Sequence, residues 1–264
     1  MPFSSHNLKS TFKEKVKKGE LVVGTWVNAV KDPIIAKLIG YAGFDYMLID
    51  AEHSGASISS ISEMCLLARE CGVYPMVRPC DPDNLKMNGR LLDAGAMGLV
   101  IPHIDSASQA LQIARSMRFF GGGTRGCVSR SIGTGFSKAN EEEMRILDEE
   151  ITCVVQFESA RAIEEADTIL AVDGIDVAIV GRGDLAHDMG LSGKTTDDRV
   201  SCMVEKVYEA ARRQKKTQGL LVNDIGEAKK WLNHGIKFLT YGSEVGWLIS
   251  AYEKGLQEIR SSAK

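Results

Sequence analysis

Residues 151–181 read ITCVVQFESARAIEEADTILAVDGIDVAIVG and contain the repeating unit from which the fold is predicted. An apolar run, ITCVVQFE (151–158), is followed by a helical pattern, ARAIEEADTILAV (160–172), and by a second apolar run, IDVAIVG (175–181). Each apolar run is hydrophobic on both faces, which is typical of a strand inside a parallel sheet. Gly174 lies between helix and strand, where glycine commonly ends a helix. The stretch therefore predicts a strand–helix–strand unit.

The same alternation extends along the chain. The apolar runs are LVVGTWV (21–27), DYMLIDAE (45–52), YPMVRP (74–79), MGLVIPH (97–103), ITCVVQFE (151–158), IDVAIVG (175–181), GLLV (219–222) and KFLTYG (237–242). Eight βα units in about 250 residues predict a parallel α/β fold, the (β/α)8 TIM barrel. An open doubly wound sheet is less consistent with this strand count and with the missing nucleotide fingerprint after the first run.

The length of 264 residues then corresponds to one domain, residues 1–264. The basic stretch 8–18 has Leu8, Phe12 and Val16 at helical spacing, and we expect it to form a helix that plugs one end of the barrel. Residues 119–150 interrupt the alternation with a long Gly/Ser-rich loop and an acidic helix. A loop of this length in a compact domain is usually functional.

Composition excludes several classes of protein. The net charge is −3, whereas proteins that bind nucleic acid or anionic membranes usually carry a basic excess. The 6 cysteines include no C-x-x-C pair, which argues against a zinc knuckle or a redox dithiol. The chain has no run of 18 apolar residues and no apolar signal core. We therefore expect a soluble, cytoplasmic protein without nucleic-acid or membrane partners.

Candidate site residues follow from the barrel, because active sites of this fold lie at the carboxyl ends of the strands. The polar residues at these ends are Trp26 and Asn28; Asp50, Glu52 and His53; Arg78; His103; Gln156 and Glu158; Gly181 to Asp184; Asn223 and Asp224; and Gly242 to Glu244. This set combines carboxylates, histidine and arginine, which suits a divalent metal and a small anionic substrate.

Glu158 and Asp184 follow neighbouring strands, which brings both carboxylates to one rim. A hard divalent cation would relieve their repulsion, and oxygen ligands favour Mg²⁺ or Mn²⁺. Alternatively, Glu158 caps the following helix and Asp184 caps a turn. The residues alone leave both interpretations open.

Three further groups are candidates for proton transfer or anion binding. His53 is a candidate base if a carboxylate such as Asp50 fixes its tautomer, and otherwise it is a surface histidine. Arg78 can hold a carboxylate or stabilise an enolate, or form an ion pair within the rim, with Asp93 as a possible partner. His103 is a reserve candidate for an acid or base.

Seven stretches make the chain resemble the HpcH/HpaI aldolase family of class II pyruvate aldolases. They are AGFDYMLIDAEH (42–53), MVRP (76–79), LLDAGAMGLVIP (91–102), TRG (124–126), VVQFES (154–159), VDGIDVAIVG (172–181) and DLAHDMG (184–190). The similarity spans residues 24–246. The metal-binding carboxylates of the family lie 26 residues apart, as Glu158 and Asp184 do here.

The resemblance implies a barrel of the phosphoenolpyruvate/pyruvate-binding type. Its implied activity is the reversible cleavage of a 4-hydroxy-2-oxo acid to pyruvate, or a related 2-oxo acid, and an aldehyde through a metal-stabilised enolate. Glu158 and Asp184 would bind Mg²⁺, Mn²⁺ or Co²⁺. His53, oriented by Asp50, would be the base, and Arg78 would hold the enolate.

The remaining implied roles concern substrate binding and assembly. Gln156 and the backbone N–H groups around Gly183 would hold the pyruvate carboxylate. The expected sets also include Trp26, Arg182 and Val222 for substrate binding and Asp93 for catalysis. The family is typically a homohexamer in which subunits exchange a helix, so the C-terminal helix is expected at oligomer contacts.

The metal loop departs from the family pattern Gly-Pro-x-Asp-Leu, because residues 181–185 read Gly-Arg-Gly-Asp-Leu. Our hypothesis is that Arg182 binds a second carboxylate on the acceptor or on a larger oxo acid; alternatively, it lies in a subunit contact. The loop 119–140 is expected to influence acceptor choice. Two other functions stay open: Claisen-type condensation of oxaloacetate or a CoA thioester, as in a citrate synthase, and oxo-acid binding without turnover.

Overall fold

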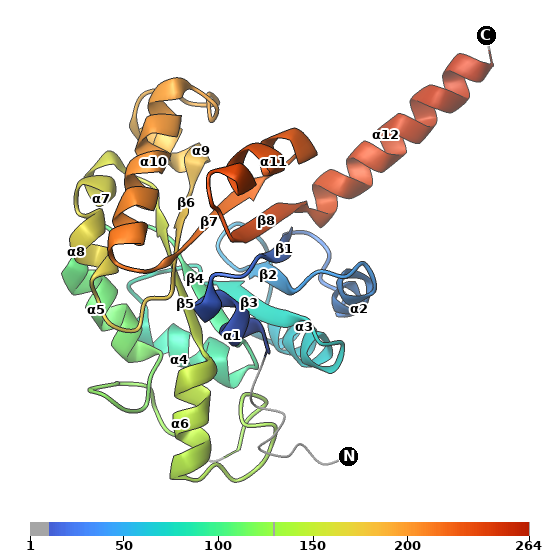
Figure 1. Ribbon diagram of the computed structural model, residues 1–264. Helices are drawn as coiled ribbons and strands as arrows, with labels where there is room; N and C mark the ends of the chain where they lie inside the picture. The colour runs from blue at the N-terminus through green and yellow to red at the C-terminus, as the bar shows by residue number, and fades with distance from the viewer. Residues whose placement is uncertain (1–10, 129, 264) are drawn as a thin grey trace.

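The computed structural model describes residues 11–128 and 130–263, in which eight parallel strands close into a barrel in sequence order (Figure 1). The strands are β1 (Val22–Val27), β2 (Tyr46–Asp50), β3 (Tyr74–Arg78), β4 (Gly98–Ile101), β5 (Thr152–Phe157), β6 (Val177–Val180), β7 (Thr217–Val222) and β8 (Phe238–Ser243). Pairing of β1 with β8 closes the barrel. The predicted (β/α)8 fold is confirmed.

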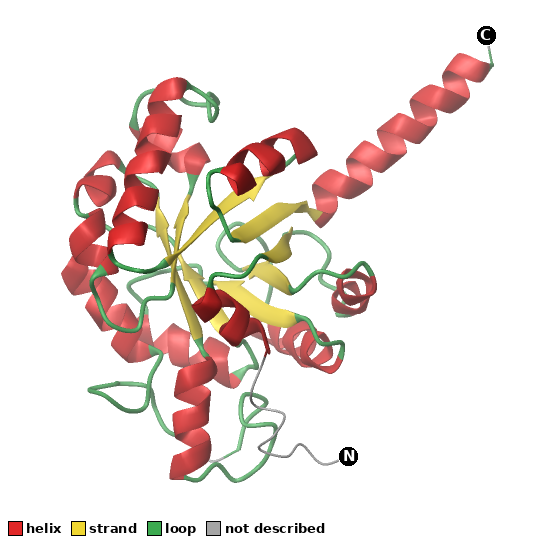
Figure 2. Cartoon of the chain, viewed as in Figure 1, coloured by secondary structure: helices red, strands yellow, loops and turns green. Residues whose placement is uncertain are grey.

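Helices surround the barrel (Figure 2). Those described are α1 (Thr11–Lys18), α2 (Ile34–Tyr41), α3 (Ile58–Glu70), α4 (Leu85–Asp93), α5 (Ala107–Ser116), α6 (Glu141–Glu150), α7 (Ala160–Glu164), α8 (Ala166–Leu170), α9 (Arg182–Asp188), α10 (Asp198–Arg213), α11 (Ile225–Asn233) and α12 (Glu244–Ser262). The helix expected over 160–172 is divided into α7 and α8, because Glu165 leaves the helical conformation with φ −90° and ψ 6°.

Helix α1 covers the amino-terminal end of the barrel, as expected. Phe12 stacks on Tyr74 with ring centroids 4.1 Å apart and also contacts the rings of Tyr46 and Phe238. Val16 is buried in the same cluster. Leu8, the third apolar residue of the predicted helix, lies outside the described residues. Aromatic packing therefore closes this end of the barrel.

Alternation along the strands determines which side chains reach the barrel interior. In β2, Tyr46 and Leu48 belong to the inner cluster, whereas Met47 and Ile49 pack in the layer beneath the helices. The next inward position of β2 is Asp50, because strand side chains alternate with a period of two. The same rule brings Arg78 of β3 and Gln156 of β5 to the interior at the carboxyl end.

Helix α12 leaves the body of the protein and projects outward (Figure 1). Its described side chains are mostly exposed, and they include an apolar set: Leu248, Ile249, Tyr252, Leu256 and Ile259. Glu244, at its first position, is buried. Among the described residues, no helix combines the length and the apolar character that crossing a membrane requires. The cysteines are free thiols: Cys65 and Cys153 are buried, Cys71 is partly buried, and Cys80, Cys127 and Cys202 are exposed, so the thiols, expected from the sequence to be reduced and mostly buried, are not mostly buried.

Candidate active site

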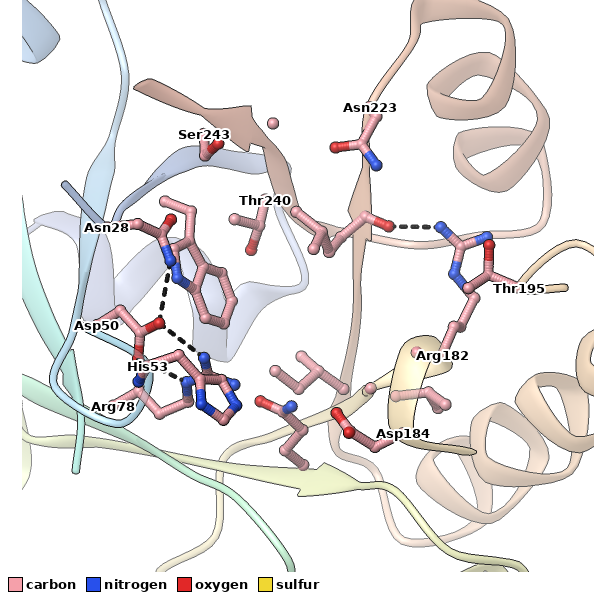
Figure 3. Close-up of a pocket in the computed structure, with 18 residues that line it drawn as sticks. Asn28, Asp50, His53, Arg78, Arg182, Asp184, Thr195, Asn223, Thr240 and Ser243 are labelled. Carbon is pink, nitrogen blue, oxygen red and sulfur yellow. Dashed lines mark hydrogen bonds and ion pairs between the residues drawn. The ribbon is translucent and has the colours of Figure 1, made fainter. Parts of the chain in front are cut away.

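A cavity of about 400 Å³ opens at the carboxyl ends of the strands (Figure 3). Its lining residues are Trp26, Asn28, Asp50, His53, Arg78, Gln156, Ile179, Val180, Gly181, Arg182, Gly183, Asp184, Thr195, Leu221, Asn223, Thr240, Gly242 and Ser243. Most of the expected site residues thus meet at one place. Val222 was expected to bind substrate, but the structure places its side chain outside the cavity, fully buried beneath the helices. The reason is the alternation along β7, which turns the preceding residue, Leu221, toward the cavity.

The Asp50 carboxylate is buried and saturated with hydrogen bonds. Arg78 donates to it through Nε at 3.0 Å and Nη2 at 2.8 Å, and Asn28 donates through Nδ2 at 3.0 Å. The backbone N–H groups of Glu52 and His53 donate to Oδ1 at 3.0 and 3.3 Å. Burial raises the pKa of Asp50, but the hydrogen bonds and charge of Arg78 and the backbone donors outweigh it, so the pKa is lowered. Asp50 is therefore an ionised anchor.

The loop after β1, which carries Asn28, is held in place by Glu244, directly after the neighbouring strand, β8. The N–H groups of Asn28, Ala29 and Val30 donate to Oε1 of Glu244, at 2.8, 2.6 and 3.0 Å. One buried carboxylate oxygen therefore satisfies three consecutive backbone donors and holds the rim of the cavity in place.

His53 lines the cavity, but its ring does not contact Asp50 in the way the sequence suggested. Asp50 binds the backbone N–H of His53, because Arg78 and Asn28 occupy its other positions. The ring Nε2 instead lies 3.8 Å from Oε2 of Glu52, and the side chain is 64% exposed. His53 thus has the access that a general base needs, with Glu52 as its carboxylate partner.

The Arg78 guanidinium lies between two carboxylates and an indole ring. Its Nη2 is 2.8 Å from Oδ2 of Asp50, and its Nη1 is 2.9 Å from Oε2 of Glu52. Its central carbon is 4.5 Å from the centre of the Trp26 ring. Charge-assisted hydrogen bonds and the stacked ring fix the guanidinium plane. Trp26 therefore supports Arg78 as well as lining the cavity.

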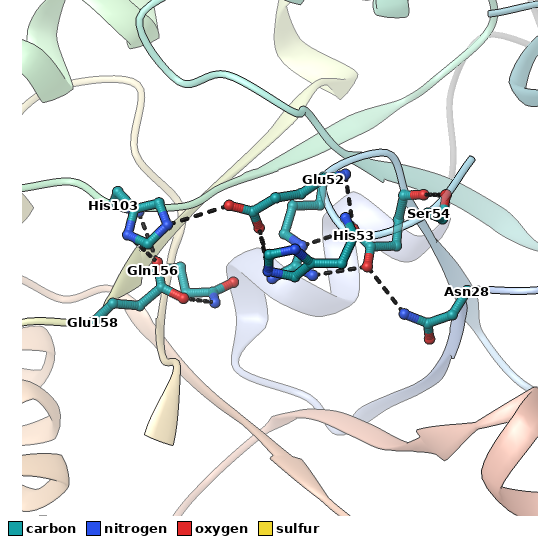
Figure 4. Close-up of polar contacts among 9 residues, drawn as sticks. Asn28, Glu52, His53, Ser54, His103, Gln156 and Glu158 are labelled. Carbon is teal, nitrogen blue, oxygen red and sulfur yellow. Dashed lines mark hydrogen bonds and ion pairs between the residues drawn. The ribbon is translucent and has the colours of Figure 1, made fainter. Parts of the chain in front are cut away.

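A chain of polar contacts continues across the barrel end through His103 (Figure 4). Its Nε2 lies 3.2 Å from Oε1 of Glu52, and its Nδ1 lies 3.2 Å from Oε2 of Glu158. The backbone N–H of His103 donates to the same Glu158 oxygen at 2.8 Å. His103 has φ +52°, an uncommon conformation for a residue with a side chain. Its backbone and its ring thus meet the same carboxylate.

Glu158 is buried and has an unusual charge environment. Its Oε1 accepts a hydrogen bond from Nε2 of Gln156. Burial raises the pKa of Glu158 to about 7, and the charge of Asp184 acts in the same direction, although the contacts with His103 and Gln156 oppose it. Gly181 makes this packing possible, since a Cβ there would lie 2.6 Å from Oε1 of Glu158.

Glu158 and Asp184 form a carboxylate pair that suits a hard cation. Asp184, near the start of α9, lines the cavity, and its charge influences the pKa of Glu158. Across residues 11–128 and 130–263, no group of three or more His, Cys, Asp or Glu side chains is placed to hold a metal. Mg²⁺ is commonly bound by one or two carboxylates together with water and substrate oxygens. Two carboxylates therefore fit this mode of binding.

Comparison with known proteins agrees with this geometry. The HpcH/HpaI aldolase/citrate lyase family matches residues 23–251. The chain belongs to this family. It is 31% identical over 244 residues to a hydroxypyruvate/pyruvate aldolase of Pseudomonas aeruginosa, covering 90% of this chain and 88% of the relative.

Solved structures support the same assignment. An HpcH/HpaI aldolase from Desulfitobacterium hafniense DCB-2 has a TM-score of 0.89 and 34% identity, covering 96% of this chain and 97% of that one. A citrate synthase has a TM-score of 0.85 at 23% identity, with 95% and 98% covered, which shows a shared fold alone. The family and the expected enzyme class, a carbon–carbon lyase, are confirmed.

Arg182 stands at the position where members of the HpcH/HpaI family usually have proline. Its Nη1 contacts Oε1 of Glu227 on α11. Its Nη2 donates to the carbonyl of Leu221 at 2.8 Å, a contact that is drawn as a dashed line from Arg182 in Figure 3. The side chains of Arg182 and Glu227 are 11% and 17% exposed. The positive charge that Arg182 adds to the rim is therefore balanced within the chain.

Asp93 does not pair with Arg78, which corrects the expected contact. Its Oδ1 lies 2.8 Å from Nη2 of Arg125, and it is outside the residues that line the cavity. The reason is directional: α4 runs back toward the amino-terminal end of the barrel, so its last residue lies far from the strand ends. Among the described residues of 119–140, none lines the cavity either.

Two residues emerge only from the three-dimensional arrangement. Glu227 lies on an outer helix and Thr195 lies in the loop after α9. Neither residue ends a strand, so the search for polar residues at strand ends did not find them. Glu52 and His103 were candidates as strand-end residues, but their joint contact with Arg78 and Glu158 depends on side-chain directions that spacing does not contain.

Proposed function

We propose that the protein is a divalent-metal-dependent aldolase that reversibly cleaves a 4-hydroxy-2-oxo acid into pyruvate, or a related 2-oxo acid, and an aldehyde. The observation that carries this proposal is the buried Glu158 carboxylate, whose pKa is raised in part by the charge of Asp184, and Asp184 lines the cavity together with His53 and Arg78. Membership of the HpcH/HpaI family and an aldolase relative over most of the chain support it.

Glu158 and Asp184 would hold the cation, which is Mg²⁺, Mn²⁺ or Co²⁺ in this proposal. When bound, such a cation supplies Lewis acidity that lowers the cost of forming the enolate of a 2-oxo acid. Gln156 and the backbone N–H groups around Gly183 would bind the carboxylate of that acid. Both residues line the cavity next to Asp184.

His53 would move the proton. In the cleavage direction it takes the proton of the 4-hydroxyl group, the C3–C4 bond breaks, and the electron pair stays on the 2-oxo acid as its enolate. The aldehyde leaves, and a proton returned to C3 gives pyruvate. Glu52, beside the ring, stabilises the protonated imidazole. Arg78, held by Asp50 and Glu52, presents a fixed guanidinium toward the developing oxyanion.

The test is exchange of the pyruvate methyl protons with solvent deuterium in the presence of Mn²⁺, followed by NMR. The assay needs the metal, the base and the donor but no aldehyde. We expect exchange in the wild-type protein, a loss of exchange in His53→Ala and in Glu158→Ala, and full exchange in the control His234→Ala, because His234 is bonded to the Lys230 carbonyl on α11. Exchange retained in both site variants would refute the assignment.

A Claisen-type condensing function, with oxaloacetate or a CoA thioester as substrate, has less support. The likeness to a citrate synthase is one of fold. Release of free CoA from a thioester substrate, measured with a thiol reagent, would favour that function over aldol cleavage.

The proposal extends to assembly and location. The apolar residues exposed on α12 favour contacts between subunits through this helix, and the resemblance to the family extends the proposal to a homohexamer in which subunits exchange it. Partners would be a small 2-oxo acid and an aldehyde in the cytoplasm, with no nucleic acid or membrane. Light scattering of the purified protein tests the assembly, and a monomer would refute it.

A further inference from the structure

Both guanidinium groups that line the cavity are already paired. Arg78 lies 2.8 Å from Asp50 and 2.9 Å from Glu52. Arg182 contacts Glu227. In the lining described, each guanidinium therefore has a carboxylate partner within the chain.

Further hydrogen bonds fix both partners of the contact between Arg182 and Glu227. Both side chains are mostly buried, so solvent and salt screen their attraction weakly. Arg182 is also bonded to the Leu221 carbonyl at the end of β7. Glu227 lies in the first turn of α11, where its N–H donates to the capping carboxylate of Asp224 at 2.8 Å. Glu227 thus holds the guanidinium in a fixed position.

Much of the remaining polar lining of the cavity is neutral. This neutral part includes hydroxyl and amide side chains: Asn28, Thr195, Asn223, Thr240 and Ser243 (Figure 3). Hydroxyl and amide groups donate and accept hydrogen bonds, which matches the hydroxyl and carbonyl groups of a sugar-like aldehyde. They do not offset the charge of a carboxylate.

We propose that Glu227 determines acceptor specificity: by pairing with Arg182 it withholds the cation that would bind a second carboxylate, and the acceptor is an uncharged hydroxyaldehyde. This inference rests on the proposed aldolase function. Glu227 is a positioning residue that acts through Arg182. Without Glu227, the Nη1 side of the Arg182 guanidinium loses its carboxylate partner, and a guanidinium in that state can bind the carboxylate of a ligand.

The experiment compares two acceptors that differ in one group: glyceraldehyde, and its analogue with a carboxylate in place of the CH₂OH group. The kcat/KM of each is measured with pyruvate and Mn²⁺. We expect the wild-type protein to prefer glyceraldehyde at least about tenfold. In Glu227→Gln the ratio should shift about tenfold toward the charged acceptor, mainly through its KM.

Matched variants separate this effect from a general disturbance. Glu142→Gln removes the same charge from the exposed surface of α6 and should leave the ratio unchanged. Arg182→Ala leaves Glu227 unpaired and should shift the ratio in the opposite direction. The double variant Arg182→Ala/Glu227→Gln should lose the gain for the charged acceptor, because that gain depends on the guanidinium.

Three outcomes would overturn the inference: an unchanged ratio in both Glu227→Gln and Arg182→Ala, a wild-type preference for the charged acceptor, or no reaction of glyceraldehyde. Deuterium exchange into pyruvate, measured on the same wild-type sample without an acceptor, separates the two proposals. Intact exchange with any of these outcomes refutes the acceptor assignment alone, whereas absent exchange refutes the aldolase function.

Discussion

At the amino-terminal end of the barrel, Nζ of Lys13 lies 2.6 Å from Oδ2 of Asp176 beneath α1. At the carboxyl-terminal end, Arg78 faces both Asp50 and Glu52, and Glu158 is buried nearby. At the first end, the buried lysine is paired with a carboxylate in a packed interior. The second end has more carboxylates than cations, and it opens into a cavity.

The two ends of the barrel show that a buried charge can serve either the stability of the fold or the function of the site. Burial lowers the pKa of Lys13, although Asp176 opposes the shift, and the pair is complete without a ligand. Glu158 has its pKa raised by burial and by Asp184, so it gains from an additional cation. Buried charge that is unbalanced within the chain therefore marks the end where a cation is expected.

The largest effect is expected from Glu158→Gln. The variant keeps the size of the side chain and removes the charge, so deuterium exchange into pyruvate should fall about 10³-fold, because metal-assisted enolisation loses a ligand. The metal-free variant should unfold at the same temperature as the wild type or higher, since an unfavourable buried charge is gone. A large loss of stability would contradict this distinction.

Lys13→Met should give the opposite result at the other end of the barrel. It leaves the Asp176 carboxylate without its cation, which should lower the free energy of unfolding by about 3 kcal/mol. The exchange rate should stay at the wild-type level at temperatures where the variant is folded. Chemical denaturation and the exchange assay measure the two quantities. A loss of exchange in the folded variant would mean that the two ends are not independent.

A smaller effect is expected from Glu52→Gln. Glu52 contacts the guanidinium of Arg78 and the rings of His53 and His103, so its loss disturbs orientation rather than the chemistry itself. We expect exchange to fall about 10- to 100-fold, the range typical of residues that orient a metal site. Glu63→Gln on α3, outside the cavity lining, is the control. Equal losses in both variants would remove the assigned role.

The smallest effect concerns pH. Because the folded pKa of Glu158 is raised to about 7, its contribution to metal-free stability is present at low pH and is lost as pH rises through 7. Metal binding needs the ionised carboxylate, so Mn²⁺ should bind about tenfold more tightly at pH 8 than at pH 6. Calorimetry at the two pH values tests this, and equal affinities would contradict it.

Much of the fold could be predicted because the period of the apolar residues is local information. Alternation of strands and helices gave the barrel, and a period of two turns Asp50, Arg78 and Gln156 inward. The run GLLV (219–222) is entirely apolar, so no polar residue in it shows which alternate positions face the barrel interior. Leu221 and Val222 could therefore not be assigned to a face from the sequence.

Contacts between side chains far apart in the chain could not be predicted in the same way. Asp93 was a plausible partner for Arg78 by its place before a strand, yet α4 takes it to the other end of the barrel. The pairing of Arg182 with Glu227 joins residues on two different helices. Such pairs depend on rotamers and on the packing of helices, which no spacing in the sequence contains.

The position of Glu244 has a practical consequence for protein engineering. This residue is both the first residue of α12 and the acceptor for the three N–H groups of the loop 28–30. The projecting arm and the catalytic barrel are therefore joined at a single residue that the barrel needs. Tags, fusions or crosslinks attached along the outer turns of the arm leave that residue in place, whereas cutting the helix at its base would release the loop that carries Asn28.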